Sequence, residues 1–155
     1  MLLGINFVKD IKNDLEASRV PQIEAYNVPS FGEGEVGTLH GGRSDSNGYK
    51  FFTIHLFGSP KIKVVKGCTV TFNGPEGSFT MKSDTKDIES YYSSKLQKGV
   101  TEFELFLDKE NLTELKKPIN EMTLDFGKSG LFKKHQYSFK VDGKKFKKFL
   151  LEKRG

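Results

Sequence analysis

Apolar residues at every second position, in several short segments between residues 49 and 141, constrain the fold more than any other feature. Successive side chains of a strand point to opposite faces, so each segment is expected to be a strand with one buried and one solvated face. The segments are Ile62 and Val64; Val70 and Phe72; Phe79 and Met81; Phe103, Leu105 and Leu107; Met122, Leu124 and Phe126; and Tyr137, Phe139 and Val141. No helical pattern of crossover length recurs between them, which predicts an antiparallel sheet.

Residues 49–57 differ because both faces of the predicted strand are largely apolar. Phe52 and Ile54 share one face, while Phe51 and Phe57 lie on the other. A strand that is apolar on both faces belongs in the middle of a sheet. We therefore expect this segment to be a central strand.

Three further segments carry turn or helix signals. The run Asn73-Gly74-Pro75-Glu76-Gly77 contains residues that favour sharp reversals, so we expect a hairpin there. Asp108 is placed to cap a short helix over residues 109–116, which Pro118 prevents from continuing. Residues 85–97 fit a helix and a strand equally well, and both interpretations stay open.

The N-terminal part of the chain lacks the strand pattern. Apolar residues at intervals of four predict an amphipathic helix within residues 1–20. Prolines and glycines then predict an irregular segment over residues 21–48, which is the best candidate hinge. At 155 residues the chain fits a single domain, 1–155, with a β-rich core over 49–141 and a basic C-terminal segment over 142–155.

Together these patterns predict a mainly β fold, either an antiparallel β-sandwich or a partly closed barrel with short N- and C-terminal helices. The alternative is an α+β fold in which helices pack on one antiparallel sheet. Fourteen Phe and no Trp predict a core rich in phenylalanine. The single cysteine excludes an intrachain disulfide, and neither a signal-peptide core nor a run of membrane-spanning length is seen. We therefore expect a cytoplasmic chain without a transmembrane segment.

Basic charge is concentrated at the C-terminal end. Residues 128–155 hold ten Lys or Arg and two acidic residues, whereas the residues before them hold fifteen basic and eighteen acidic ones. This points to an anionic partner, and the candidate polyanion-binding residues are Lys144, Lys145, Lys147, Lys148, Lys153 and Arg154. Phe146 and Phe149 either stack on bases or insert at a lipid interface, or they anchor a terminal helix on the sheet. The helical spacing favours the anchor.

The densest cluster of polar groups runs from residue 40 to residue 48. Its glycines expose backbone amides and Arg43 supplies a planar cation, so His40, Gly41, Gly42 and Arg43 form a candidate anion-binding loop. The segment lacks the Gly-Lys-Ser/Thr ending of phosphate loops, which favours a plain connection between strands. An enzymatic interpretation places a site at His40, Arg43, Asp45 and His55, and it requires these groups to converge.

Other residue types give no metal or cofactor signature. The three histidines have no partner at the spacing of a metal motif, so we predict neither a metal nor a cofactor. We interpret His55 as a hydrogen-bonded interior histidine and Cys68 as a small buried hydrophobe. For Glu102 and Glu104, the strand period favours solvated charge over a general acid and base. The other acidic pairs are Glu33 with Glu35 and Asp84 with Asp87.

These observations favour a non-catalytic binding or assembly domain that acts through protein–protein contacts, with a protein partner or a homo-oligomer. The alternative is binding of nucleic acid, another polyanion or an acidic surface through the basic tail. A second alternative is an enzyme with a site near residues 40–48.

Overall fold

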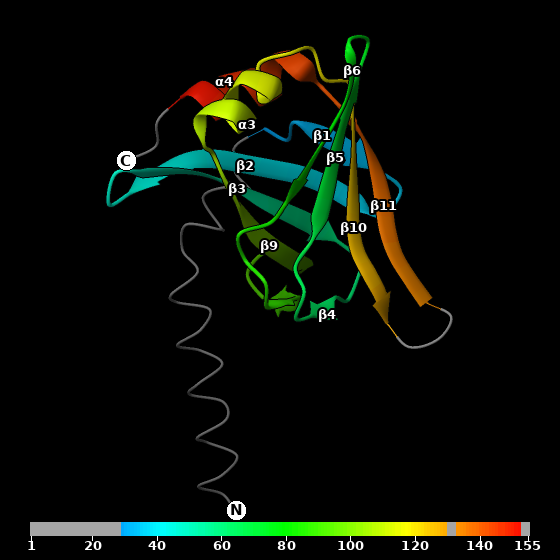
Figure 1. Cartoon of the computed structure of the whole chain (residues 1–155). Helices are drawn as coiled ribbons and strands as arrows, with labels where there is room; N and C mark the ends of the chain where they lie inside the picture. The colour runs from blue at the N-terminus through cyan, green and yellow to red at the C-terminus, as the bar shows by residue number, and fades with distance from the viewer. Residues whose placement is uncertain (1–28, 130–132, 153–155) are drawn as a thin grey trace, which may run out of the picture.

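The computed structural model of the chain describes residues 29–129 and 133–152. The amphipathic helix predicted within residues 1–20 lies outside the described residues, as do Lys153 and Arg154. Strands dominate the described part, and two short helices cover one end of it (Figure 1).

Nine strands form one sheet in the spatial order β6-β5-β10-β11-β1-β2-β3-β9-β8. Their bounds are β1 Gly32–Gly34, β2 Gly37–Ser46, β3 Tyr49–Gly58, β5 Thr69–Gly74, β6 Gly77–Lys82, β8 Tyr91–Ser93, β9 Lys98–Phe106, β10 Glu121–Ser129 and β11 Lys133–Val141. A small second sheet pairs β4 (Lys63–Val64) with β7 (Ile88–Glu89). Every neighbouring pair is antiparallel, as predicted, and β3 lies between β2 and β9 as a central strand.

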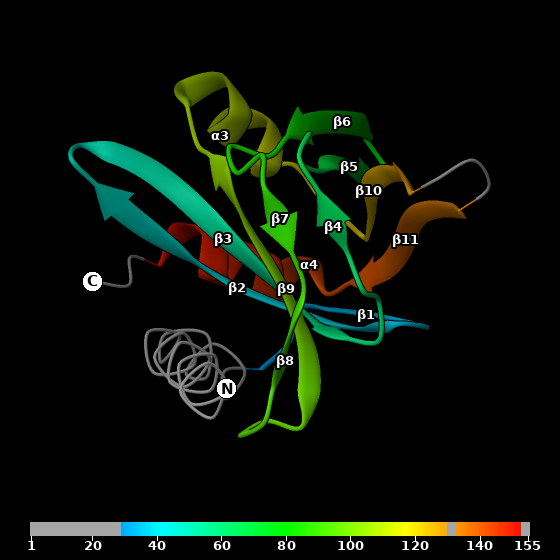
Figure 2. The same cartoon turned by 90° about the horizontal axis from the view of Figure 1, so that it is seen from below.

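The large sheet curls around the core without closing. In Figures 1 and 2 the wall of β5, β6, β10 and β11 crosses the wall of β2, β3 and β9. Just after β6 the chain reaches β9, where Asp84 N donates to Glu104 O at 2.8 Å and Glu104 N donates to Thr85 Oγ1 at 3.0 Å. Within the described ranges the end strands β6 and β8 do not pair with each other. The predicted mainly β, antiparallel fold is therefore confirmed, in an open and curled form.

Phenylalanine rings fill the space inside the curl, as the composition predicts. The helix α4 (Gly143–Leu151) closes one end because its Phe146 ring contacts three other rings of the core. Phe146 stacks on Phe31 and on Phe72, with ring centroids 5.3 and 5.8 Å apart, and meets Phe52 edge-on at 5.4 Å. Burying large aromatic side chains is among the strongest contributions to stability, so α4 is an integral part of the fold.

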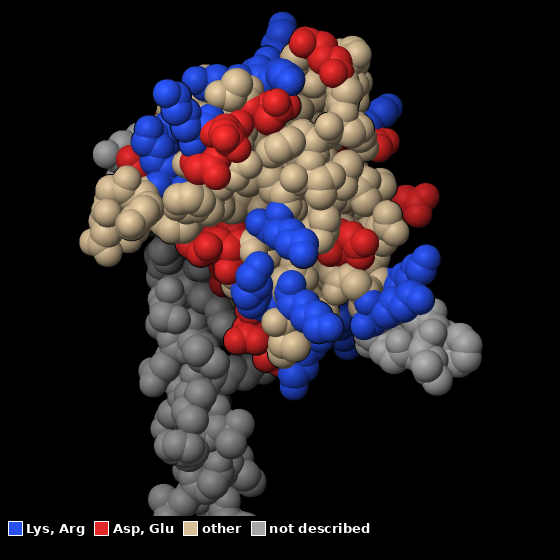
Figure 3. Space-filling model, viewed as in Figure 1, with Lys and Arg blue, Asp and Glu red and all other residues tan. Residues whose placement is uncertain are grey.

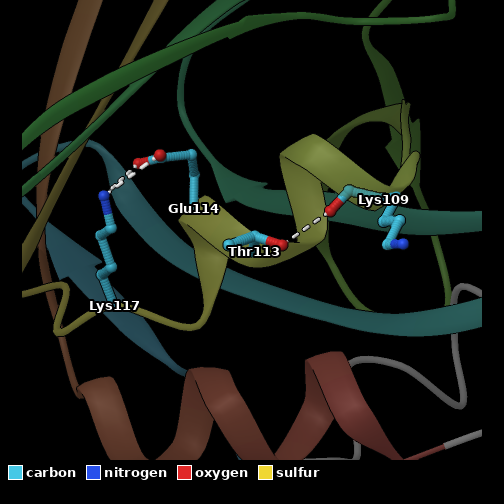
Figure 4. A network of polar contacts seen from close by, with 4 residues as sticks. All are labelled: Lys109, Thr113, Glu114 and Lys117. Atoms are coloured by element: carbon cyan, nitrogen blue, oxygen red, sulfur yellow. Dashed lines mark hydrogen bonds and ion pairs between the residues drawn. The ribbon is translucent and has the colours of Figure 1, made fainter.

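The helix α3 (Lys109–Leu115) lies at the same end of the molecule (Figure 1). Asp108 caps it as predicted, accepting a hydrogen bond from Asn111 N at 2.7 Å, and the buried Leu115 fixes it to the core. Figure 4 shows its exposed polar contacts: Thr113 Oγ1 donates to Lys109 O at 2.9 Å, and Lys117 Nζ lies 2.9 Å from a Glu114 carboxylate oxygen.

The irregular segment predicted over residues 21–48 is wrong for residues 32–46, which form β1 and β2. Glycine was interpreted there as a loop signal. Gly41 instead makes room within a strand, because a Cβ at this position would lie 2.6 Å from Thr53 O and 2.9 Å from the Phe52 ring. The connection itself is the tight turn Asn47-Gly48, where both residues adopt positive φ, 52° and 83°.

Within residues 85–97 the chain forms two short strands, β7 and β8, and no helix, so the strand interpretation is confirmed there. Ile88 is buried and pairs with Val64 across the small sheet, while β8 pairs with the start of β9. The predicted half-buried strand around Ile62 and Val64 is shorter than its alternation suggests, since only Lys63 and Val64 pair. The hairpin predicted at residues 73–77 is confirmed by the pairing of β5 with β6.

Candidate functional site

The basic tail is anchored in the core rather than presented as a free arm. Asp142 caps α4, accepting hydrogen bonds from Lys144 N and Lys145 N at 3.1 Å. Phe146, Phe149 and Leu150 are at most 4% exposed. The two rings therefore cannot stack on bases or enter a lipid interface while the fold is intact, and their predicted role as anchors is confirmed.

The lysines of α4 face the solvent. Lys144, Lys145 and Lys148 are exposed and Lys147 is half-buried. In the part of the chain that the structure describes, none of these four forms an ion pair. Figure 3 shows one group of basic side chains at the end of the molecule that carries the helices and another at the opposite end. The four lysines thus remain chemically able to contact phosphates.

The candidate residues of the 40–48 segment are divided between two faces of the sheet. Residues 37–46 pair with β3 in unbroken register, so side chains three positions apart point to opposite faces. His40 lies directly opposite His55, whereas Arg43 lies opposite the buried Phe52. Arg43 shares its face with Asp45, whose carboxylate oxygen is 3.4 Å from Arg43 Nε. His40 and Arg43 therefore do not join in one site.

The face that carries His40 and His55 holds a buried polar row across β2, β3 and β9. His55 lies opposite Glu102, and His55 Nε2 is 3.4 Å from Glu102 Oε2. Thr38 Oγ1 is 3.0 Å from His40 Nε2, and the Phe57 ring lies 5.0 Å from the His40 ring. An imidazole beside a carboxylate can carry a proton, but the two histidines are only 5% and 6% exposed. This burial limits access of any substrate to them.

His55 matches its predicted interior position. Its Nε2 faces Glu102, while its Nδ1 is buried and has no hydrogen-bond partner among residues 29–129 and 133–152. The predicted interior position of His55 is therefore confirmed, and its polar partner on the Nε2 side is Glu102.

The prediction of solvated charge for Glu102 and Glu104 is wrong, since both side chains are half-buried. Glu102 packs beside His55. Burial raises the pKa of Glu104 above its usual value, and the nearby charges of Asp84 and Glu102 raise it further. The strand period alone misses this because the segment after β6 crosses the edge of β9 at Glu104.

Cys68 is a buried hydrophobe, as predicted. It is 2% exposed, and its backbone N–H donates to Ser83 Oγ at 2.9 Å. Burial raises the pKa of the thiol, which disfavours the reactive thiolate. Across residues 29–129 and 133–152, no cluster of His, Cys, Asp or Glu is arranged to hold a metal ion. Nor is any helix of that part long and apolar enough to span a membrane.

Sequence reasoning missed a pocket of about 450 Å³, lined by residues 58–63, residues 89–92 and Gly99. We call it the tyrosine pocket. Figure 1 places β4, which contributes to it, at the end of the molecule away from α3 and α4. Two hydrogen bonds hold its rim: Ile62 N donates to Ser90 Oγ, and Ser90 N donates to Ile62 O, both at 2.8 Å.

Glycines of adjacent strands lie in a row beside the pocket. Gly37, Gly58 and Gly99 lie opposite one another on β2, β3 and β9, and Tyr92 of β8 continues the row. A Cβ on Gly58 would lie 1.9 Å from Val36 O, and one on Gly99 would lie 2.4 Å from Gly58 O. Close backbone approach thus requires glycine at Gly58 and Gly99, the two glycines of this row that line the pocket.

The chemistry of the tyrosine pocket combines aromatic and cationic groups. Tyr92 is 59% exposed, and the lining residues Lys61 and Lys63 are exposed as well. Glu89 lies directly opposite Lys63 in the small sheet. A volume of this size with an apolar wall and a few charged groups is typical of a ligand or peptide site. The adjacent tyrosines at 91 and 92 were the available signal, but the sequence left their structure undecided.

The chain matches no protein-family model, no curated protein and no solved structure.

Proposed function

We propose that this chain is a non-catalytic binding domain that acts through protein–protein contacts, and that the tyrosine pocket is its contact site. The observation that carries the proposal is the exposed Tyr92 beside a hollow of about 450 Å³. Tyrosine is enriched among the residues that dominate binding energy, because its ring buries a large area while its hydroxyl hydrogen-bonds. Val65, 72% exposed and one residue beyond β4, adds apolar surface near the rim.

The experiment compares three baits of the full chain in an extract of the source cells: the unaltered protein, Tyr92→Ala and Tyr49→Ala. Tyr49 is a matched control because it is also 59% exposed but lies at the end of β3 that is away from Gly58 and the pocket. We expect Tyr92→Ala to lower capture of a specific partner by at least about tenfold, the effect of losing a strong interface residue, and Tyr49→Ala to leave it unchanged. The captured partner is then purified and titrated against the same three proteins. Equal affinity for all three would contradict the proposal.

Polyanion binding is a second candidate function, supported by the four exposed or half-exposed lysines of α4 that make no ion pair in the described ranges. Because Phe146 and Phe149 are buried, such binding would use phosphate contacts alone and would be insensitive to base sequence. Four phosphate contacts give a slope of log K against log salt no steeper than about −3.6 for duplex DNA.

Truncation of the tail cannot test this function, because α4 belongs to the core. The sharper variant replaces Lys144, Lys145, Lys147 and Lys148 with Gln. Its control replaces four exposed lysines elsewhere, Lys50, Lys82, Lys128 and Lys134, and so removes the same charge. Fluorescence anisotropy of labelled duplex DNA should show binding lost in the first variant and retained in the control. Equal loss in both would indicate only a general effect of net charge.

We propose no enzymatic function for the set His40, Arg43, Asp45 and His55, because β2 and β3 place the two histidines and the Arg43–Asp45 pair on opposite faces.

A further inference from the structure

The charges around the tyrosine pocket suggest what kind of protein segment it receives. Lys61 and Lys63 line the pocket, and Lys66 continues the same segment. Lys95 adds a cation on the turn between β8 and β9. Among the pocket-lining residues, Glu89 is the one acidic side chain. Figure 3 shows basic side chains at this end of the molecule, with acidic ones beside them.

The acidic group in the pocket does not cancel its cations. Glu89 faces Lys63 across β4 and β7, yet the described contacts include no ion pair between them. Lys61 has no acidic cross-strand neighbour, because β4 begins at Lys63. The rim therefore keeps a net positive charge above an apolar wall formed by Pro60, Ile62 and the tyrosine rings.

We propose that the tyrosine pocket binds a short acidic segment of a partner protein, with an apolar or aromatic side chain in the hollow and carboxylates beside Lys61 and Lys63. This inference rests on the proposed function and specifies its partner. Cations at the rim attract the acidic segment and orient it, while burial of its apolar side chain against Tyr92 supplies most of the affinity. A nucleic-acid duplex keeps its bases stacked inside and offers no anchor for the hollow, so it fits the lysines of α4 better than this pocket.

The test is a titration of the ¹⁵N-labelled full chain, followed by amide chemical shifts. The probe is the capped peptide acetyl-Asp-Glu-Phe-Asp-Glu-amide, at concentrations up to about 2 mM because a short peptide binds weakly. Two control peptides replace its Phe with Ser, or its four acidic residues with Lys. We expect the probe to shift the amides of Ser90, Tyr92 and Gly99, and each control peptide to bind at least about fivefold more weakly.

Two variants test the role of the rim. Lys61→Gln with Lys63→Gln should weaken binding of the acidic probe at least about fivefold, whereas Lys144→Gln with Lys145→Gln removes the same charge from α4 and should leave binding unchanged. Both pairs are exposed, so folding is preserved. Equal binding of the Lys-containing peptide, or shifts centred on α4, would overturn the inference.

The outcomes separate this inference from the proposed function. If partner capture depends on Tyr92 but not on Lys61 and Lys63, the pocket is a protein contact site, but the proposal that it binds an acidic segment is wrong. If neither partner capture nor binding of the probe peptide depends on Tyr92, both proposals are wrong.

Discussion

The Phe146 ring of α4 stacks on the Phe72 ring of β5, with centroids 5.8 Å apart and ring planes inclined by 5°. This contact joins the basic C-terminal segment to the wall of the curled sheet that contains β5. The same ring also reaches Phe31 and Phe52 on the other wall. The C-terminal segment is therefore needed for the fold whatever its lysines bind.

Replacing Phe146 with Ala should lower the free energy of unfolding by about 3–5 kcal/mol, because the substitution removes a fully buried ring and leaves a cavity between two walls. Chemical denaturation of the purified protein measures this. Lys148→Ala, on the exposed side of the same helix, should change stability by less than about 0.5 kcal/mol. A loss below about 1 kcal/mol for Phe146→Ala would show that α4 is not part of the core.

The alternation of apolar and polar residues correctly predicted the strands that bury one face and expose the other. The strands around Phe103, Leu124 and Phe139 were predicted because their alternation of apolar and polar residues is undisturbed. The Asp108 cap and the breaker Pro118 likewise placed α3 correctly. These signals are local, so the sequence carries them directly.

Glycine misled the prediction where a tertiary contact requires it. Gly41 accommodates the Phe52 ring inside β2, and Gly58 and Gly99 allow backbones to approach at one end of the sheet. Glycine occurs both in turns and at positions where two backbones approach closely. The sequence alone does not distinguish these two reasons for a missing side chain. The tyrosine pocket was missed because its lining comes from residues 58–63, residues 89–92 and Gly99, which only the folded chain brings together.

The raised pKa of Glu104 predicts how stability depends on pH. Between the usual value of 4.5 and the higher pKa in the folded state, the folded protein holds a proton that the unfolded chain has lost. The free energy of unfolding should therefore fall as the pH rises through this window. Glu104→Gln removes the burial penalty, so this variant should be more stable than the unaltered protein at pH 7 and no more stable below pH 4.5.

Denaturation curves of both proteins over this pH range provide the measurement. Glu76→Gln, which removes an exposed carboxylate at the β5–β6 turn, controls for the change in net charge. A Glu104→Gln variant that is less stable at pH 7 would mean that Glu104 forms a favourable interaction as a carboxylate.

Cys68 should be inert in the folded protein. Burial raises the pKa of its thiol, and only a local or global opening exposes it. We expect a disulfide reagent such as Ellman's reagent to react at least about 100-fold more slowly with the folded protein than with the chain in denaturant, because opening of a core strand costs several kcal/mol. Comparable rates would place the thiol at the surface.

The most direct test of the central claim replaces Tyr92, in the full chain expressed in its source cells, with the photo-crosslinking residue p-benzoylphenylalanine. The same residue at position 49 serves as the control, since Tyr49 and Tyr92 are equally exposed, at 59%. We expect a discrete protein adduct from position 92 and none from position 49. Adducts of equal yield at both positions, or none at position 92, would contradict the assignment of the tyrosine pocket as a protein-binding site.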